Sequence, residues 1–271
     1  MLLFKDRFNK FTNRNTKASY QAAIESFESF LLGTYGPEVN EGNVSRTQMI
    51  EYNNFLADNF EEERTISKNI YALRSYFKYL YKSDYIDRDP STILESPRIK
   101  RKSPVLISKD DLDKMLDFKL NTIEDYRLKV IILLLYYTGI KATELVELLI
   151  DDIEDHSLTV CNQSEDIRII PLNDQTVQAI DQYLQTRDEL KVKSQYLLHS
   201  KKGEKLDRKS LWRILDKGID KQLFNNRINP DTFRENYIIN RLCELQYLLG
   251  YDSLATLMNY IRDNIRYMKT E

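Results

Sequence analysis

A continuous apolar segment in the middle of the chain constrains the fold most strongly. The pattern of residues 126–139 predicts a helix, and its centre, VIILLLYYTG, is apolar on every side of that helix. Such a helix must be covered by other elements, and it is too short to cross a membrane. We therefore expect a core helix with the surrounding chain packed around it.

The composition favours a mainly helical globular protein. The 271 residues suffice for one large domain or two ordinary ones, and they include only 7 glycines and 6 prolines. Cys161 and Cys243 provide no disulfide framework, and the N-terminus is too short and polar for a signal peptide. We therefore expect a cytoplasmic protein with no membrane partner. His156 and His199 have no neighbouring ligand residues, so no metal site is predicted.

The overall charge of −2 argues against a generic nucleic-acid-binding protein, since such proteins are usually basic. Residues 1–104 contain 16 Lys and Arg against 14 Asp and Glu, whereas the rest of the chain contains 24 against 28. Any affinity for DNA must therefore come from charges placed on particular faces.

Three helices are predicted in the first third of the chain. The first covers 16–32 with Gly33 as its stop, and the second begins at Ser45, which has capping-box spacing with Gln48. The third covers 65–82 and has two distinct faces about 200° apart, at ~100° per residue. Its core face carries Ile66, Ile70, Leu73, Phe77 and Leu80, and its opposite face carries Arg64, Lys68, Tyr71, Ser75, Lys78 and Lys82.

The basic face of the third helix has two open interpretations. It is either a solvated surface or a surface that contacts DNA phosphates through Arg64, Lys68, Lys78 and Lys82. A proline-bounded basic segment follows at 96–104, and it predicts a domain boundary. We divide the chain into a domain at 1–97, a linker at 98–104 and a second domain at 105–271. Within the linker, Lys100, Arg101 and Lys102 either contact DNA or are solvated.

The stretch from Asn229 to Tyr260 carries a recognisable spacing. Asn229 and Pro230 predict a helix start, because the Asn side chain caps a free N–H and proline needs none at the first helical position. Arg234 lies in the first turns of that helix. Residues 248–250, Leu-Leu-Gly, are predicted to end a second apolar helix, and Tyr260 follows ten residues after the glycine.

This spacing resembles the tyrosine recombinases, the phage-integrase family, whose second motif region is His-x-x-Arg, then Leu-Gly-His, then a nucleophilic Tyr nine residues later. Asp231 and Tyr251 replace the two histidines, while Arg234 and Tyr260 keep their places. The interval from Arg234 to Gly250 is several residues shorter than is usual in the family, as if a turn between two helices had been trimmed.

Other stretches extend the resemblance over nearly the whole chain. Residues 138–145, TGIKATEL, resemble the first family motif, Thr-Gly-x-Arg-x-x-Glu-Leu, with Lys141 in place of arginine. Two predicted strands at 158–161 and 166–170 resemble the family hairpin, which carries a catalytic lysine in active members but not here. The implied fold is mainly α (α+β overall). It comprises an N-terminal helical core-binding (SAM-like) domain and a C-terminal helical catalytic-type domain with a small antiparallel sheet.

The resemblance implies a reaction on double-stranded DNA with no metal or other cofactor. Tyr260 would attack a phosphodiester, while Arg234 and Lys141 would stabilise charge on the phosphate oxygens. Tyr251 can donate a hydrogen bond. Asp231 would repel the phosphate unless it pairs with a lysine or with Arg234. Family members assemble on DNA, so a homo-oligomer or a second recombinase is the expected partner, in a mobile-element or chromosome-resolution system.

The departures from the motifs leave three hypotheses open. The chain is a recombinase of attenuated activity, a catalytically inactive DNA-binding accessory or regulatory protein, or a helical interaction protein with no DNA role. Loss of one preorganised donor costs ~10²–10³ in rate, and several are changed here. Lys201, Lys202 or Lys205 could replace the missing hairpin lysine as the acid.

Overall fold

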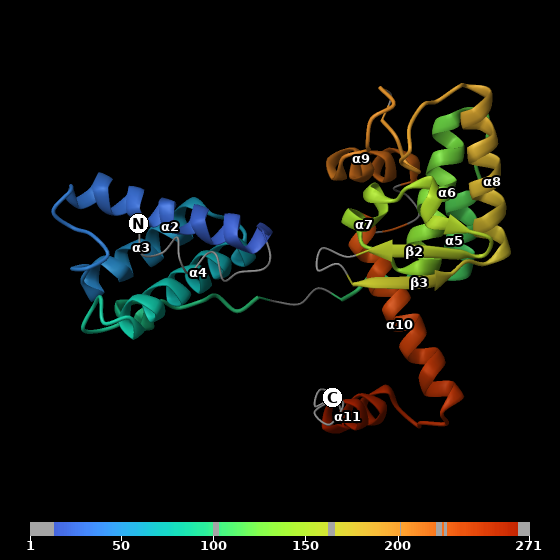
Figure 1. The fold of residues 1–271 in the computed structure, drawn as a ribbon. Coiled ribbons are helices and arrows are strands. Elements are labelled where there is room, and N and C mark those ends of the chain that lie inside the picture. The colour runs from blue at the N-terminus through green and yellow to red at the C-terminus, as the bar shows by residue number, and fades with distance from the viewer. Residues whose placement is uncertain are drawn as a thin grey trace. The chain divides into compact units, whose positions relative to one another are not determined.

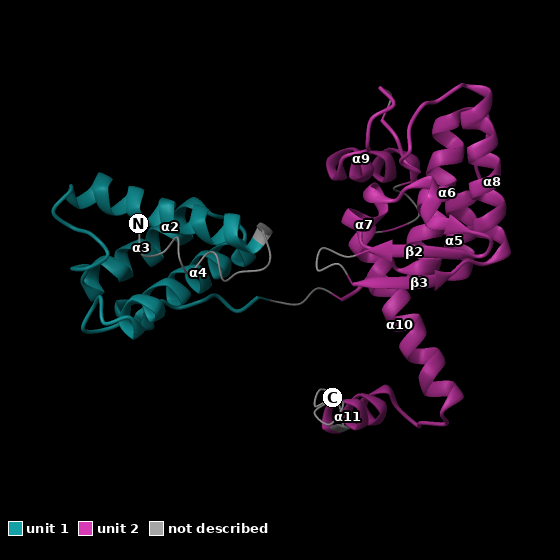
Figure 2. Ribbon diagram, viewed as in Figure 1, with its two compact units in different colours: residues 1–102 teal, residues 103–271 magenta. Residues whose placement is uncertain are grey.

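The computed structural model describes residues 14–99, 103–161, 166–200, 202–220, 224 and 227–264 of the chain. The chain divides into two compact units, unit 1 at 1–102 and unit 2 at 103–271 (Figure 2). The three basic linker residues that we predicted to contact DNA, Lys100, Arg101 and Lys102, lie outside the described residues.

Unit 1 is a helical domain built around aromatic side chains. Its described elements are α2 (Arg14–Tyr35), α3 (Arg46–Asn59), α4 (Glu63–Lys82) and the 3₁₀ turn η1 (Pro90–Ile93) (Figure 1). Phe27 of α2 lies at the centre, with its ring 4.8 Å from that of Tyr52 and 5.7 Å from that of Phe77, both edge to face. Edge-to-face pairs place the positive ring edge on the negative face, so these rings hold the three helices together.

The capping box predicted for the second helix is confirmed, but the stop predicted for the first is wrong. Ser45 N donates to Gln48 Oε1 at 2.7 Å, and Gln48 N donates to Ser45 Oγ at 3.3 Å. The first helix continues through Gly33 to Tyr35, and Gly36 is the residue with a positive φ, 76°. A proline follows at position 37, which cannot continue a helix, so the left-handed end lies at Gly36.

Unit 2 is organised around α6 (Ile123–Thr138), which packs against several other helices of the unit. Residues 130–135 of this helix are fully buried, so the predicted core helix is confirmed. The surrounding helices are α5 (Lys109–Leu116), α7 (Ala142–Glu147), α8 (Asp174–Glu189), α9 (Arg208–Gly218), α10 (Pro230–Leu248) and α11 (Leu254–Asn264).

A small antiparallel sheet completes unit 2, in the order β1 (Ile153–Glu154), β2 (Ser157–Cys161), β3 (Ile167–Pro171); the 3₁₀ turn η2 (Ile150–Asp152) precedes it. Val160 pairs with Arg168, and Leu158 pairs with Ile170. Residues paired directly across two strands share a face, so Arg168 lies on the face of the buried Leu158, Val160 and Ile170. The predicted fold class, mainly helical with a small antiparallel sheet, is confirmed.

The two helices predicted between Asn229 and Gly250 are a single helix, α10, so this prediction is wrong. No glycine or proline interrupts residues 231–248, and the shortened interval leaves no turn. The helix ends where predicted: Gly250 has a φ of 68°, and Tyr251 N donates to Gln246 O at 3.0 Å. In Figure 1, α11 lies at this far end of α10.

Over the described residues, no helix combines the length and the apolar character that crossing a bilayer requires. Within the same residues, no three His, Cys, Asp or Glu side chains are grouped so that they could hold a metal ion.

Candidate active site

The end of α6 is the point where α10 docks. Gly139 takes a left-handed φ of 59°, and a side chain added there would lie 2.4 Å from Cδ1 of Tyr237. Both features require glycine. The carbonyl of Gly139 accepts a hydrogen bond from Arg234 Nη1 at 2.5 Å. The Arg234 guanidinium is therefore fixed on a backbone carbonyl that lies two residues before Lys141 in the chain.

The first turns of α10 are held by their own side chains. Asn229 Oδ1 accepts hydrogen bonds from the backbone N–H groups of Asp231 and Thr232 at 2.9 and 3.1 Å, which confirms the predicted helix cap. Asn236 accepts from Ile107 N at 2.7 Å and donates to Val105 O at 2.6 Å. These bonds connect α10 to the start of unit 2 and keep Arg234 in place.

Glu144 joins two cations at the start of α7. Its Oε1 and Oε2 accept hydrogen bonds from Arg168 Nη1 and Nη2 at 3.0 and 2.7 Å. Lys141 Nζ lies 3.7 Å from Oε1, and Lys141 N donates to Oε2 at 2.8 Å. The Glu144 side chain is 5% exposed, against 52% for Lys141 and 38% for Arg168. A buried carboxylate thus anchors two partly exposed cations.

The ionisation of this cluster follows from its contacts. Burial alone would raise the pKa of Glu144, but the hydrogen bonds from Arg168 and from the Lys141 backbone, with both positive charges, lower that pKa below its ordinary value. The hydrogen bond to Glu144 raises the pKa of Arg168 further. Lys141, Arg168 and Arg234 carry three positive charges against two negative charges, on Glu144 and on Asp231, so the net charge of these residues is positive and favours an anion.

Asp231 does not neutralise the site through an ion pair. It is exposed in the first turn of α10, where a negative charge interacts favourably with the helix dipole. Arg234 gives a hydrogen bond to Gly139 instead, and no lysine among the described residues pairs with Asp231.

Tyr251 and Tyr260 lie together at the other end of α10. Their ring centroids are 6.3 Å apart, and Tyr260 is 58% exposed. Gln246 holds Tyr251 through two hydrogen bonds of 3.0 Å. Gln246 follows Arg234 by 12 residues, about 18 Å along a helix axis. The structure therefore holds Arg234 on Gly139, two residues before Lys141 in the chain, and brings Tyr251 to Tyr260, but it places these two groups near opposite ends of α10.

The predicted phosphate-contact face of α4 is exposed in unit 1. Ile70, Leu73 and Phe77 are fully buried on the opposite face. The exposed face carries four basic side chains and a tyrosine, in the order Arg64, Lys68, Tyr71, Lys78 and Lys82.

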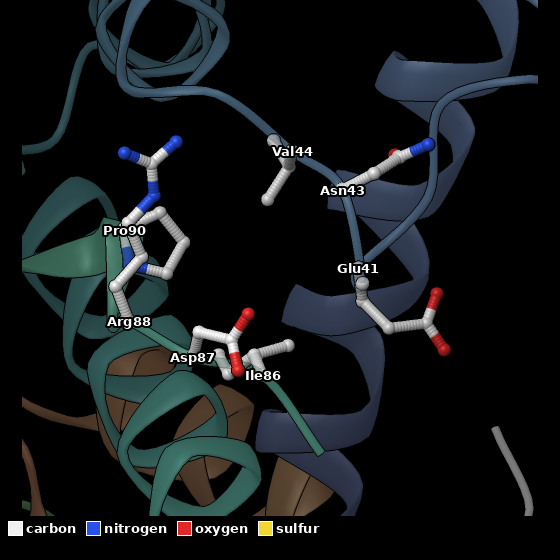
Figure 3. Close-up of a pocket in the computed structure, with 8 residues that line it drawn as sticks. Glu41, Asn43, Val44, Ile86, Asp87, Arg88 and Pro90 are labelled. Atoms are coloured by element: carbon white, nitrogen blue, oxygen red, sulfur yellow. The ribbon is translucent and has the colours of Figure 1, made fainter. Parts of the chain in front are cut away.

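Of two cavities in the described residues, one is lined by residues of the candidate site and the other is not. In unit 1 a cavity of about 420 Å³ lies between residues 41–44 and 86–90, with Arg88 and Pro90 on one side and Val44 and Glu41 on the other (Figure 3). It holds charges of both signs and none of the candidate residues. In unit 2 a cavity of about 500 Å³ is lined by Glu144 and by Lys205. Lys205 Nζ binds Glu147 Oε1 at 3.0 Å, so a lysine lies beside the anchored cluster.

The model of the phage integrase family matches residues 106–266, more than half of the chain. The chain belongs to the phage integrase family. It is 27% identical over 267 residues to the tyrosine recombinase XerD of Oceanobacillus iheyensis, covering 94% of this chain and 89% of that protein. It is 29% identical over 262 residues to the tyrosine recombinase XerC of Herpetosiphon aurantiacus, covering 91% and 84%.

Solved structures show the same fold. The XerH site-specific recombinase in its post-cleavage complex with the difH substrate matches with a TM-score of 0.68 at 17% identity, covering 93% of this chain and 78% of that one. A lambda integrase dimer bound to a COC′ core site matches with a TM-score of 0.65 at 14% identity, covering 96% and 94%.

The family motifs alone did not reveal the partners of the candidate residues in this phage integrase family member. Glu144 was visible only as part of the first motif, and Arg168 only as part of a strand. Their pairing spans 24 residues and depends on the strand register, which no local pattern encodes. Tyr237 could have been noticed, because it lies one turn after Arg234 on the same helix.

Proposed function

We propose that this protein is a DNA-binding, site-specific tyrosine recombinase that breaks and rejoins double-stranded DNA through a phosphotyrosyl intermediate. The observation that carries this proposal is the fixed guanidinium of Arg234, held on Gly139 beside Lys141, in a chain that keeps a tyrosine at the family position. The named relatives XerC and XerD are tyrosine recombinases, and the XerH and lambda integrase structures contain DNA. Action on DNA is consistent with the cytoplasmic location that we also propose.

Each proposed catalytic residue has one role in a transesterification. The Tyr260 oxygen releases its proton to water and forms a bond to phosphorus, while the bond from phosphorus to the 5′ oxygen breaks and that oxygen takes up a proton. Arg234 and Lys141 stabilise charge on the non-bridging oxygens. Tyr251 donates a hydrogen bond. Lys205, held by Glu147 beside the Glu144 cluster, supplies the proton to the leaving oxygen.

The reaction runs slowly in this proposal. Lys141 keeps a positive charge but has no planar fork, and so it holds a single phosphate oxygen where an arginine holds two. Asp231 adds a negative charge near Arg234. A single lost donor costs about 10²- to 10³-fold in rate.

DNA is held by both units. Residues 1–97, which lie within unit 1, act as the core-binding domain, and the exposed face of α4 contacts phosphates through Arg64, Lys68, Lys78 and Lys82. The linker at 98–104 adds Lys100, Arg101 and Lys102. Residues 105–271 form the catalytic-type domain.

A second copy of the chain is the proposed protein partner. Three residues at the end of α10 expose large apolar side chains: Tyr247 (85%), Leu248 (69%) and Leu249 (58%). An apolar surface of this kind on a soluble helix is usually covered by another molecule. Tyr260 lies near this end of α10, far from the Arg234 of the same copy. A site in which one copy supplies Tyr260 and its neighbour supplies Arg234 would account for both the exposed apolar residues and this separation.

Covalent trapping tests the proposed function. Purified protein is incubated with fragmented DNA from its source organism, denatured, and separated on a gel that detects protein-bound DNA. We expect an adduct that Tyr260→Phe abolishes. Absence of an adduct together with salt-sensitive binding would instead establish the second candidate, a catalytically inactive DNA-binding accessory or regulatory protein. The substitutions at Lys141, Asp231 and Tyr251 favour that candidate. Absence of both would leave a helical interaction protein.

A further inference from the structure

Arg168 has no assigned role in the proposed chemistry, yet it lies within the cationic cluster. It projects from β3 on the same face as Val160 and forms a two-bond contact with Glu144. We propose that Arg168 contacts the same DNA phosphate as Arg234 and Lys141, and supplies the second planar guanidinium that position 141 lacks. This inference rests on the proposed function and assigns a further ligand to the same site.

The hydrogen-bonding capacity of Arg168 leaves room for a phosphate. A guanidinium has five N–H donors, and the contact with Glu144 uses two of them. The side chain is 38% exposed, so part of it faces solvent, where an anion can approach. The remaining donors lie in a plane that the carboxylate fixes, and a fixed donor loses little free energy to reorganisation when it binds.

The anchor of Arg168 is firmer than that of Lys141. Glu144 is buried. Its carboxylate accepts a hydrogen bond from the backbone N–H of Lys141 at 2.8 Å and one from each of Nη1 and Nη2 of Arg168. Lys141 Nζ is 3.7 Å from the carboxylate and more exposed, so its side chain can move. Arg168 therefore provides the preorganised contact, and Lys141 the adaptable one.

Tyr237 connects Arg168 with the Arg234 side of the site. Its ring packs against Gly139, whose carbonyl accepts a hydrogen bond from Arg234, and Tyr237 adds to the interactions, led by the hydrogen bond to Glu144, that raise the pKa of Arg168. Arg168, Lys141 and Arg234 therefore surround the same short segment at the end of α6. A phosphate there would meet three cations, with the charge of Glu144 balanced by Arg168 and the charge of Asp231 as the remaining negative one.

A simpler role for Arg168 is to neutralise Glu144 without touching DNA, and a pair of variants separates the two roles. Arg168→Ala alone would remove both side-chain hydrogen bonds of a buried carboxylate, leaving it only Lys141, and could fail to fold. Glu144→Gln removes that charge, so the informative comparison is Glu144→Gln against the double variant Glu144→Gln/Arg168→Ala. Circular dichroism and thermal unfolding first establish that both variants are folded.

The measurement is the affinity for a 30-base-pair DNA duplex, by fluorescence anisotropy over a range of salt concentrations. Direct contact predicts that the double variant binds about 3- to 10-fold more weakly than Glu144→Gln, with a slope of log affinity against log salt smaller by about one. Equal affinity and equal slope would overturn the proposal, since neutralisation is no longer needed once Glu144 is gone.

Arg234→Ala and Lys119→Ala complete the design. Lys119 is an exposed lysine after α5, and its removal controls for the loss of one positive charge from unit 2. If Arg234→Ala weakens DNA binding but the double variant binds as tightly as Glu144→Gln, only the role of Arg168 is rejected. If neither weakens binding beyond the Lys119 control, the proposed phosphate site itself is wrong.

Discussion

Lys141 is the residue at which this chain departs most clearly from its family's chemistry. Its side chain is 52% exposed and its ammonium lies 3.7 Å from Glu144 Oε1, so it keeps the charge of the expected arginine without the fixed fork. Lys141→Arg should therefore raise the rate of covalent adduct formation by about 10- to 100-fold. The rate is measured by quenching time points on the trapping gel. Lys141→Ala is the matched control and should lower it; a slower Lys141→Arg enzyme would show that the lysine is not a weakened clamp.

Gly139 fixes the contact between α6 and α10. Gly139→Ala should destabilise the protein by about 2 kcal/mol, because alanine is strained at a φ of 59° and its Cβ would meet Tyr237. Urea unfolding measures the change. Gly139→Ala/Tyr237→Ala should cost less than the sum of the two single variants, because the clash disappears while the backbone strain stays. Strict additivity would argue against the clash.

Glu144 makes stability depend on pH in a definite direction. Its folded pKa is lowered, so its ion pair stabilises the native state above the ordinary carboxyl pKa, and this contribution is lost as the pH falls through the folded value. The free energy of unfolding of the wild type should therefore fall more steeply below about pH 4.5 than that of Glu144→Gln. Urea unfolding at a series of pH values compares them. Parallel curves would mean that Glu144 is not paired.

At the scale of elements, α4 divides its two faces between the core and the proposed DNA contact. Lys68→Ala/Lys78→Ala should weaken DNA binding and reduce the salt slope by about two, since each phosphate contact contributes ~0.9. Anisotropy titrations at several salt concentrations give both quantities. Arg46→Ala removes an exposed charge from α3 and serves as the control. An unchanged slope for the double variant would mean that the face is only solvated.

Elements whose signals are local could be predicted from the sequence. The all-apolar centre of α6 required burial, and Ser45 with Gln48 located the start of α3. The prediction that the first helix stops at Gly33 was wrong because Gly36, followed by Pro37, provides the left-handed helix end, and Gly33 lies inside the helix. The continuity of α10 was missed because the family pattern suggested a turn that this shorter sequence does not contain.

The candidate site was predictable only in part, because its contacts join segments that are distant in the sequence. Arg234, Lys141 and Tyr260 were identified by motif spacing, which is a property of the chain. The bond from Arg234 to Gly139 and the pairing of Arg168 with Glu144 depend on how distant segments pack. The separation of Tyr260 from Arg234 likewise follows from the length of α10, because a continuous helix of 19 residues places its two ends far apart.

At the scale of the whole molecule, the proposed active site needs two copies of the chain. Tyr260→Phe lacks the nucleophile and Arg234→Ala lacks the clamp, so neither should form an adduct alone. A mixture of the two should form one, because the Arg234→Ala copy can donate its intact tyrosine to the intact clamp of its neighbour. Intact mass spectrometry identifies which chain carries DNA. An inactive mixture beside an active wild type would show that α11 acts within its own copy.

Mapping the covalent adduct tests most directly whether Tyr260 attacks a phosphate held by Arg234 and Lys141. The trapped complex is digested with nuclease and protease, and the peptides are sequenced by mass spectrometry. We expect a nucleotide attached to Tyr260, with the yield reduced at least about 100-fold in Arg234→Ala. A nucleotide on any other residue, or an equal yield from Arg234→Ala, would contradict this chemistry.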